Sequence, residues 1–113
     1  MTKLQLFFST IVMYPNASTD KESILKDHKE KAGIYLWTHL GSGKMYVGSA
    51  VDLSRRLKNY YSTYKLKRAN NYICNALNHH KYSAFSLSIL EYIDITNLSL
   101  EEARKLILER EQY

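Results

Sequence analysis

Short runs of alternating side chains predict a β-hairpin in the first half of the chain. Residues 34–39 and 44–49 are rich in β-forming types, and Gly41-Ser42 supplies a two-residue turn between them. Because side chains alternate between the two faces of a strand, both runs contribute to one apolar face. That face is expected to carry Ile34, Leu36, Met45 and Val47.

The length of the turn decides which residues of the hairpin stand opposite each other. With a two-residue turn, Tyr35 pairs with Gly48 and Trp37 pairs with Tyr46. Tyr35 and Tyr46 are then diagonal neighbours on one face, about 7–8 Å apart at the backbone. We therefore expect the two phenols to converge, with Gly33 and Gly48 leaving room beside them.

Helical periodicity predicts four helices, over residues 18–31, 53–62, 70–80 and 100–113. Ser18 or Thr19 can cap the first helix, and Asp52 can cap the second. Ser99 and Glu102 form a capping box ahead of the last helix. Arg56 and Tyr60 are four residues apart in the second helix, so they share one face of it.

One more strand and two helix faces supply the remaining core positions. Phe85, Leu87 and Ile89 alternate with serines, which predicts a third strand. Residues 1–17 are predicted to be an edge strand or a tail. The inward residues of the last two helices are expected to be Ile73, Ala76, Leu77, Ala103, Ile107 and Leu108.

Composition narrows the class of protein. The chain has 113 residues with 45% hydrophobic and 24% charged content, which suits one small globular domain. Cys74 is the single cysteine, so neither an intrachain disulfide nor a Cys-x-x-Cys zinc site can form. The N-terminal apolar run is too short and too interrupted to span a membrane. We expect no membrane association.

Basic residues concentrate in the middle of the chain. From Lys44 to Lys81 there are eight Lys or Arg and one acid, Asp52, so this segment carries +7 within a chain at +5. Such a segment predicts a surface for a polyanion, although a solvated basic helix face has the same composition. The candidate nucleic-acid contacts are Lys44, Arg55, Lys58, Lys65, Lys67 and Arg68. Tyrosines that could stack on bases or simply pack are Tyr60, Tyr61, Tyr64 and Tyr72.

Several motifs follow one another in the order and spacing of a known family. Gly33-Ile34-Tyr35 precedes Tyr46-Val47-Gly48, with ten residues between the tyrosines, and the segment SAVDLSRRL follows directly. The later segments FSLSILE and EREQY come in the same order. Over residues 32–113 the chain resembles the GIY-YIG nucleases, and it is most similar to the intron-encoded homing endonucleases of fungal mitochondria.

The resemblance implies an architecture. The fold expected from it is α/β (α+β), a three-stranded antiparallel sheet flanked by helices. Residues 32–113 would form the catalytic domain, and residues 1–31 an N-terminal extension with a short helix. The family also has an asparagine in a segment after the last helix, so the catalytic domain is expected to be incomplete at its C-terminus.

The resemblance also implies an activity and the residues that carry it. Members cut DNA phosphodiesters with one divalent metal ion, Mg²⁺ or Mn²⁺, which Glu111 would bind. The catalytic residues implied by the motifs are Tyr35, Tyr46, Arg56, Tyr60 and Glu111. The residues expected to shape the site are Gly33, Gly48 and Ser49.

The residue types suit this chemistry. Arg56 can hold phosphate oxygens with its planar guanidinium, and Glu111 offers hard oxygen ligands. A tyrosine is a poor base unless a metal or an arginine stabilises its anion. We expect Tyr46 to deprotonate the attacking water and Tyr35 to position water and phosphate.

Simpler interpretations remain open at this point. Tyr35 and Tyr46 could be packing residues of the sheet, Arg56 a solvated arginine, and Glu111 an ordinary exposed acid. The alternative function is a nucleic-acid-binding module that does not cleave, with DNA or intron RNA as its partner. The resemblance further suggests a monomer encoded and located in a mitochondrion.

Overall fold

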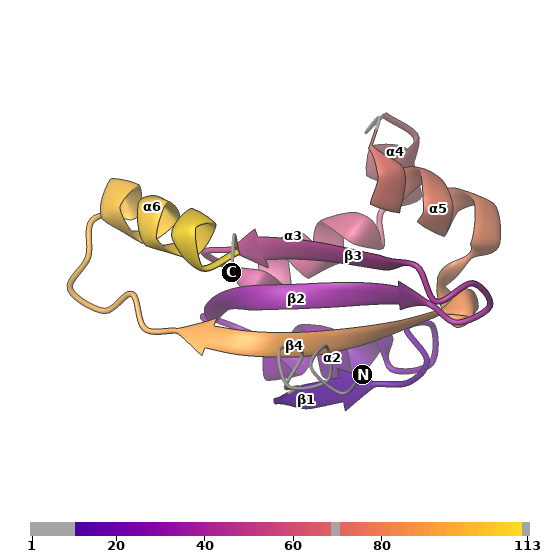
Figure 1. The fold of residues 1–113 in the computed structure, drawn as a ribbon, viewed down its shortest axis with the longest axis horizontal. Helices are drawn as coiled ribbons and strands as arrows, with labels where there is room; N and C mark the ends of the chain where they lie inside the picture. Colours follow the sequence, from indigo (N-terminus) through magenta and orange to yellow (C-terminus); the bar gives the residue numbers. More distant parts are fainter. Residues whose placement is uncertain (1–10, 69–70, 112–113) are drawn as a thin grey trace, which may run out of the picture.

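The computed structural model describes residues 11–68 and 71–111 and contains one antiparallel sheet with helices around it (Figure 1). The strands are β1 (Val12–Tyr14), β2 (Ala32–His39), β3 (Met45–Ala50) and β4 (Phe85–Ile93). The helices are α2 (Lys21–Asp27), α3 (Leu53–Tyr60), α4 (Thr63–Arg68), α5 (Tyr72–His80) and α6 (Leu100–Glu111). A 3₁₀ turn over Tyr82–Ala84 leads into β4.

The sheet confirms the predicted fold class and adds one strand to it. Its order is β1-β4-β2-β3, so the described sheet has four strands rather than three. The additional strand is β1, which pairs with β4 at the edge. The prediction of an edge strand within residues 1–17 is therefore confirmed for Val12–Tyr14, and residues 1–10 lie outside the described part of the chain.

The hairpin has the predicted register but a longer loop. Tyr35 pairs with Gly48 and Trp37 with Tyr46, as expected. However, the His39 amide donates to the Lys44 carbonyl, so Leu40 to Gly43 form a four-residue loop instead of a two-residue turn. The pairing of residues is unchanged because the predicted two-residue turn and the observed four-residue loop have the same centre.

The helices agree with the predicted segments, with three differences. Asp52 caps α3 by accepting from the Arg55 amide, and Ser99 and Glu102 form the expected reciprocal capping box. The first helix begins later than predicted, after Asp20 rather than Ser18 or Thr19. Its entry turn is organised by Asn16, whose side chain accepts from the amides of both predicted capping residues. The helix α4 was not predicted, and both α2 and α3 are shorter than expected.

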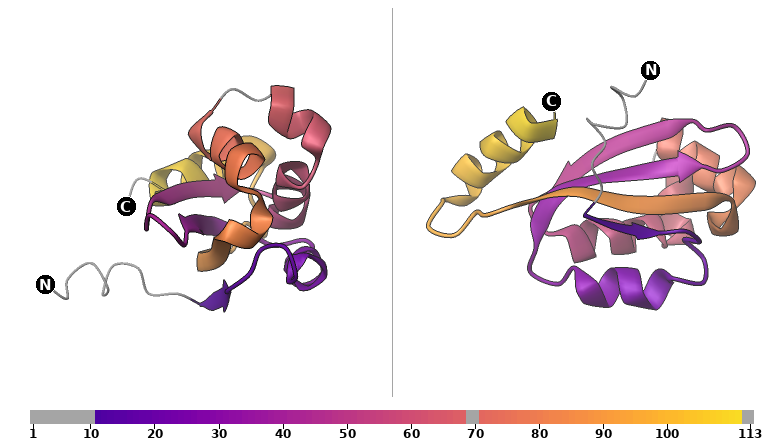
Figure 2. Two further views of the ribbon diagram at one scale, coloured as in Figure 1. Left: turned by 90° about the vertical axis from the view of Figure 1, so that its right-hand side faces the viewer. Right: turned by 60° about the horizontal axis from the view of Figure 1, so that its bottom comes forward.

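The two faces of the sheet are covered very differently. The main core lies between the sheet and helices α2, α3 and α5, and it includes Trp37 and Phe85, both fully buried. A smaller cluster around Ile34 and Ile107 lies under α6. Figures 1 and 2 show α6 at one end of the sheet, away from α2 and α3.

This uneven cover corrects two sequence-based expectations. Met45 and Val47 were expected to belong to an apolar inner face, but they are 54% and 51% exposed because α6 does not extend over them. Leu108 was expected to point inward, but it is 57% exposed. The buried residues of α6 are Ala103 and Ile107, and Leu106 packs against the cluster that contains Ile107.

Candidate active site

Three predicted site residues meet between strand β2 and helix α3. The Tyr35 hydroxyl and the Tyr60 hydroxyl are 2.7 Å apart and hydrogen-bonded, and Arg56 Nε donates to the Tyr35 hydroxyl at 3.4 Å. The Asp52 cap sets where α3 begins, and the four-residue spacing puts Arg56 and Tyr60 on the same side of it. We call Tyr35, Arg56 and Tyr60 the phenol–arginine cluster.

Burial controls the charges in this cluster. Tyr35 is 1% exposed and Tyr60 is 8% exposed. Burial, together with the neighbouring Tyr35, raises the pKa of Tyr60 well above its ordinary value, so this phenol stays neutral. The hydrogen bond to Tyr35 raises the pKa of Arg56, so its guanidinium stays charged. The cluster therefore presents the fixed positive charge of Arg56 beside the neutral phenol of Tyr60.

The two glycines of the repeated motif make room for different neighbours. A Cβ at Gly48 would lie 2.5 Å from both Cζ and the hydroxyl of Tyr35, so this glycine admits the tyrosine ring. A Cβ at Gly33 would collide with the backbone carbonyl oxygen of Glu91. The strand pairing shifts register beside Gly33, between Ile34 and Tyr35, and brings the β4 backbone close.

Tyr46 is placed differently from Tyr35. It lies on β3, which is the edge strand of the sheet, and its side chain is only partly buried against the main core. Its hairpin position opposite Trp37 agrees with the predicted pairing. The Tyr46 phenol is therefore more accessible to solvent than those of Tyr35 and Tyr60, which are 1% and 8% exposed.

A second group of predicted residues joins strand β3 to helix α6. The Ser49 hydroxyl donates a hydrogen bond to Oε1 of Glu111, and both side chains are partly exposed. Glu111 follows the buried Ile107 by one helical turn, which brings its carboxylate to the β3 side of α6.

A cavity of about 440 Å³ connects the two groups. Arg56 of the phenol–arginine cluster and Ser49, the partner of Glu111, both line it. Arg55 and Arg104 line it as well, and we therefore call it the arginine cavity. Tyr46, Tyr35 and Glu111 are not among its lining residues. The structure thus brings Arg56 close to Tyr35 and Tyr60 directly, and relates it to Glu111 only through this cavity.

Sequence reasoning missed Arg104. It lies outside the basic segment, within the more acidic C-terminal part of the chain. Because Arg104 directly follows the buried Ala103, the helix pattern indicates its direction on α6. The pattern does not indicate which residues of other elements it approaches. Only the packing of α6 against β2 and β3 brings it to the cavity that Arg55 and Arg56 line.

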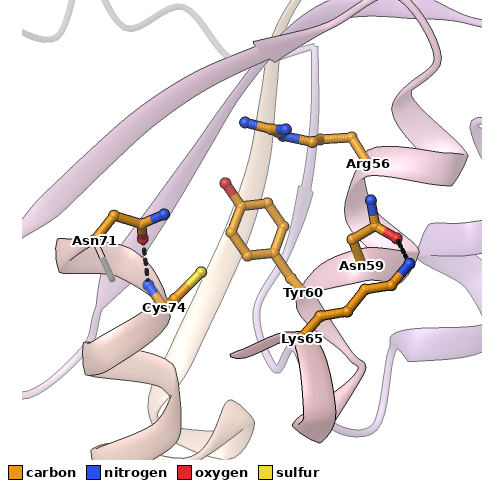
Figure 3. Close-up of a pocket in the computed structure, with 6 residues that line it drawn as sticks. All are labelled: Arg56, Asn59, Tyr60, Lys65, Asn71 and Cys74. Atoms are coloured by element: carbon orange, nitrogen blue, oxygen red, sulfur yellow. Dashed lines mark hydrogen bonds between the residues drawn. The ribbon is translucent and has the colours of Figure 1, made fainter. Parts of the chain in front are cut away.

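A smaller cavity of about 190 Å³ also has Arg56 in its lining (Figure 3). Its lining residues are Arg56, Asn59, Tyr60, Lys65, Asn71 and Cys74. The Asn71 side chain caps α5 by accepting from the Cys74 amide, and Lys65 Nζ donates to Oδ1 of Asn59. We call it the asparagine cavity. Its two asparagines were not predicted, because an asparagine in a polar segment is common in turns and caps.

The predicted nucleic-acid contacts lie on several elements. Lys44 is exposed directly after the hairpin loop, and Arg55, Lys58 and Lys65 are exposed on α3 and α4. The last three, with Lys21 of α2, line one open cavity beside α3. Lys67 and Arg68 belong to α4, but their side chains lie outside the described part of the structure. Among the tyrosines, Tyr64 and Tyr72 are 68% and 84% exposed, whereas Tyr60 is buried.

The carboxylates present fit only a metal ion that keeps most of its water. Within residues 11–68 and 71–111 no group of three or more His, Cys, Asp or Glu side chains could hold a metal. Glu111 alone offers a partly exposed carboxylate at the predicted position. Mg²⁺ is commonly bound through one or two carboxylates while several waters remain on it, so a single glutamate is compatible with this ion.

Comparison with known proteins gives the class of the domain. A model of the GIY-YIG catalytic domain matches residues 31–113, so the chain belongs to the GIY-YIG nuclease family. A solved structure, a mutant of the catalytic domain of intron endonuclease I-TevI, is 32% identical with a TM-score of 0.53. That match covers 72% of this chain and 76% of the other. No curated protein sequence matches.

The family assignment confirms the predicted fold and a nuclease domain, for which DNA is the implied substrate. Among the described helices, none combines the length and the apolar content needed to cross a membrane.

Proposed function

We propose that this domain is a divalent-metal-dependent DNA endonuclease that hydrolyses phosphodiester bonds as the catalytic domain of a homing endonuclease. The observation that supports the proposal most directly is the position of Arg56. Its guanidinium is held by Tyr35 and lines the same cavity as Ser49, the partner of Glu111. A phosphate in the arginine cavity would meet up to three arginines and lie near the carboxylate.

Each residue has a separate task in this proposal. Arg56, with Arg55 and Arg104, binds the phosphate oxygens and stabilises the negative charge that develops there. The Tyr35 hydroxyl accepts from Arg56 and holds its guanidinium in place, and the hydrogen bond to Tyr60 fixes the Tyr35 hydroxyl. Tyr46, the partly exposed phenol, takes the proton of the attacking water. A Mg²⁺ or Mn²⁺ ion at Glu111 would supply additional positive charge at the phosphate when bound.

The test is cleavage of supercoiled plasmid by the full chain in the presence of Mg²⁺ or Mn²⁺. Replacement of Arg56 by Ala should lower the nicking rate by about 10²–10³-fold, the usual cost of removing a donor that stabilises transition-state charge. Lys105→Ala is the matched control, because Lys105 is an exposed cation on α6 that lines none of the cavities described above. Equal rates for the two variants would contradict the proposed role of Arg56.

The metal site has its own readout. Titration of the protein with Mn²⁺, followed by water proton relaxation, should show one bound ion in the wild type. Glu111→Gln should lose it, because a neutral amide is a weaker ligand for a hard cation than a carboxylate. Unchanged Mn²⁺ binding by Glu111→Gln would reject Glu111 as the ligand, whatever the nicking rate.

The second candidate function is a module that binds DNA or intron RNA without cutting it. The row of Lys21, Arg55, Lys58 and Lys65 along one open cavity favours it, because phosphate contacts need only such cations. Binding with a steep salt dependence but no metal-dependent nicking would support this alternative. The intron and mitochondrial origin remain predictions from the family resemblance.

A further inference from the structure

The asparagine cavity presents almost only hydrogen-bond donors. Asn71 Oδ1 accepts from the Cys74 amide and Asn59 Oδ1 accepts from Lys65 Nζ. Both donors are N–H groups without an acceptor lone pair, so the oxygen of each asparagine must be the atom engaged. The amide nitrogen of each asparagine is therefore left to donate. Figure 3 shows the Asn71 nitrogen directed toward Tyr60 and the Asn59 nitrogen directed toward Arg56.

The charges around the cavity have one sign. Arg56 and Lys65 contribute two cations, and none of the six lining residues is an acid. Burial raises the pKa of both the Tyr60 phenol and the Cys74 thiol, so neither contributes an anion near neutral pH. A cavity with two cations, two free amide N–H₂ groups and no acid is complementary to an anion rather than to a neutral ligand.

The position of the cavity identifies which anion it suits. Arg56 and Asn59 line both the asparagine cavity and the arginine cavity, so the two are contiguous. The Ser49–Glu111 pair adjoins only the arginine cavity, through Ser49. If the scissile phosphate occupies the arginine cavity, a strand that continues past Arg56 carries its next phosphate into the asparagine cavity.

We propose that the asparagine cavity, through Asn71, Asn59 and Lys65, binds the DNA phosphate next to the scissile one on the same strand. This inference rests on the proposed nuclease function for the identity of the neighbouring phosphate. The anion site itself depends only on the donors that line the cavity.

The substitution Asn71→Asp removes the hydrogen-bond donor of Asn71 but keeps the side-chain oxygen that caps α5. Aspartate caps a helix as well as asparagine does, so α5 retains its N-terminal hydrogen bond. The substitution replaces the free N–H₂ group by a carboxylate oxygen, which repels phosphate. Asn75→Asp is the matched control, because it adds the same charge to the same helix at an exposed residue outside the cavity.

Affinity for a duplex oligonucleotide is measured at several salt concentrations with the full chain, without metal, so that nothing is cut. For Asn71→Asp we expect about tenfold weaker binding at low salt, and a slope of log K against log salt that is smaller by about 0.9, the value for one phosphate contact. Asn75→Asp should keep the wild-type slope. Equal losses and equal slopes for the two variants would overturn the proposal.

Lys65→Gln supplies a second measurement, in case Asn71→Asp alters the thermal unfolding midpoint. It should lower the slope by about one phosphate contact, and an unchanged slope would also count against the site. The neighbouring position is tested by single methylphosphonates on either side of the mapped cut. The uncharged linkage should weaken wild-type binding at the adjacent phosphate but not binding by Asn71→Asp. Sensitivity at a distant phosphate only would overturn the assignment to the adjacent one.

The two proposals fail separately. If the wild type does not cleave DNA but Asn71→Asp shows the expected binding loss, the anion site stands and the nuclease proposal falls. If the wild type cleaves and Asn71→Asp binds like Asn75→Asp, the anion site falls alone.

Discussion

The two halves of the hairpin carry the same residue types in very different surroundings. Gly33 and Tyr35 belong to β2, which has neighbours on both sides, whereas Tyr46 and Gly48 belong to the edge strand β3. Tyr35 is 1% exposed and hydrogen-bonded to Tyr60, whereas Tyr46 is partly exposed. Gly33 faces a backbone carbonyl, whereas Gly48 faces the Tyr35 ring.

This difference teaches that a symmetric motif need not make a symmetric site. A central strand places its tyrosine in the core, where the phenol can support a neighbouring guanidinium but is shielded from water. An edge strand leaves its tyrosine accessible to water and substrate. The glycines differ for the same reason. The strand β2 has a neighbouring strand on each side, whereas the edge strand β3 has one neighbour only.

Gly33→Ala should be the most damaging change. Its Cβ would overlap the Glu91 carbonyl oxygen, and backbone on a central strand pair cannot move aside without breaking the pairing. Overpacking of this kind costs about 1–3 kcal/mol and sometimes more, so we expect at least about 3 kcal/mol here. Urea unfolding measures the loss.

The matched control for Gly33→Ala is Glu91→Gln. It removes the side-chain ion pair with Arg110 while the Glu91 carbonyl stays in place. A partly exposed pair of this kind contributes about 0.2–1 kcal/mol. If Glu91→Gln destabilised the protein as much as Gly33→Ala, the backbone explanation would be wrong.

Gly48→Ala should cost less, and its cost should depend on Tyr35. The added Cβ meets a side-chain ring rather than backbone, so the ring can shift at a cost of about 1–3 kcal/mol. The shift would also move the hydroxyl that Arg56 contacts, and nicking should fall with it. In a Tyr35→Leu background the same substitution should cost under about 0.5 kcal/mol. A cost that stays the same in that background would contradict the ring collision.

Removal of single hydroxyl groups should separate the two tyrosines. Tyr35→Phe leaves the buried Tyr60 hydroxyl without its partner, at a cost of about 1–3 kcal/mol. Tyr46→Phe should change stability by less than about 0.5 kcal/mol but lower the nicking rate by about 10²-fold or more, if Tyr46 is the base. Urea unfolding and plasmid nicking are measured for both variants. Equal stability losses would contradict the proposed difference between Tyr35 and Tyr46.

The smallest effect should appear at alkaline pH. The pKa of Tyr60 is raised in the folded protein, so above its ordinary value of 10.0 the unfolded chain loses this proton first. Stability from Tyr60 is therefore fully present below about pH 10 and declines as the pH rises further. The urea midpoint should fall above pH 10, and Tyr60→Phe should reduce the slope of that fall. A urea midpoint that falls more steeply with pH in Tyr60→Phe than in the wild type would contradict the raised pKa of Tyr60.

Local sequence signals predicted most of the fold. The register of the hairpin followed from the even spacing of paired residues, and the beginning of α3 and α6 followed from Asp52 and from Ser99 with Glu102. These features depend on residues within a few positions of one another. The short strand β1 was only one of two options, because three residues carry little periodicity.

The site was predictable where its residues share one element and not where they come from several. The face common to Arg56 and Tyr60 follows from their spacing on one helix. The convergence of Arg104 with Arg55 and Arg56, and that of Asn71 with Asn59 and Lys65, depends on how separate helices pack. No local pattern contains that information.

By itself, therefore, the sequence determined the strands β2, β3 and β4, the hairpin register, the caps of α3 and α6 and the family, because these depend on short-range geometry and on ordered motifs. The tertiary structure alone decided which residues are covered. It left Met45, Val47 and Leu108 exposed, buried Tyr35 but not Tyr46, and placed Arg56 in the lining of two cavities. The physical reason is that burial depends on what lies across the sheet, and those partners are distant in the chain.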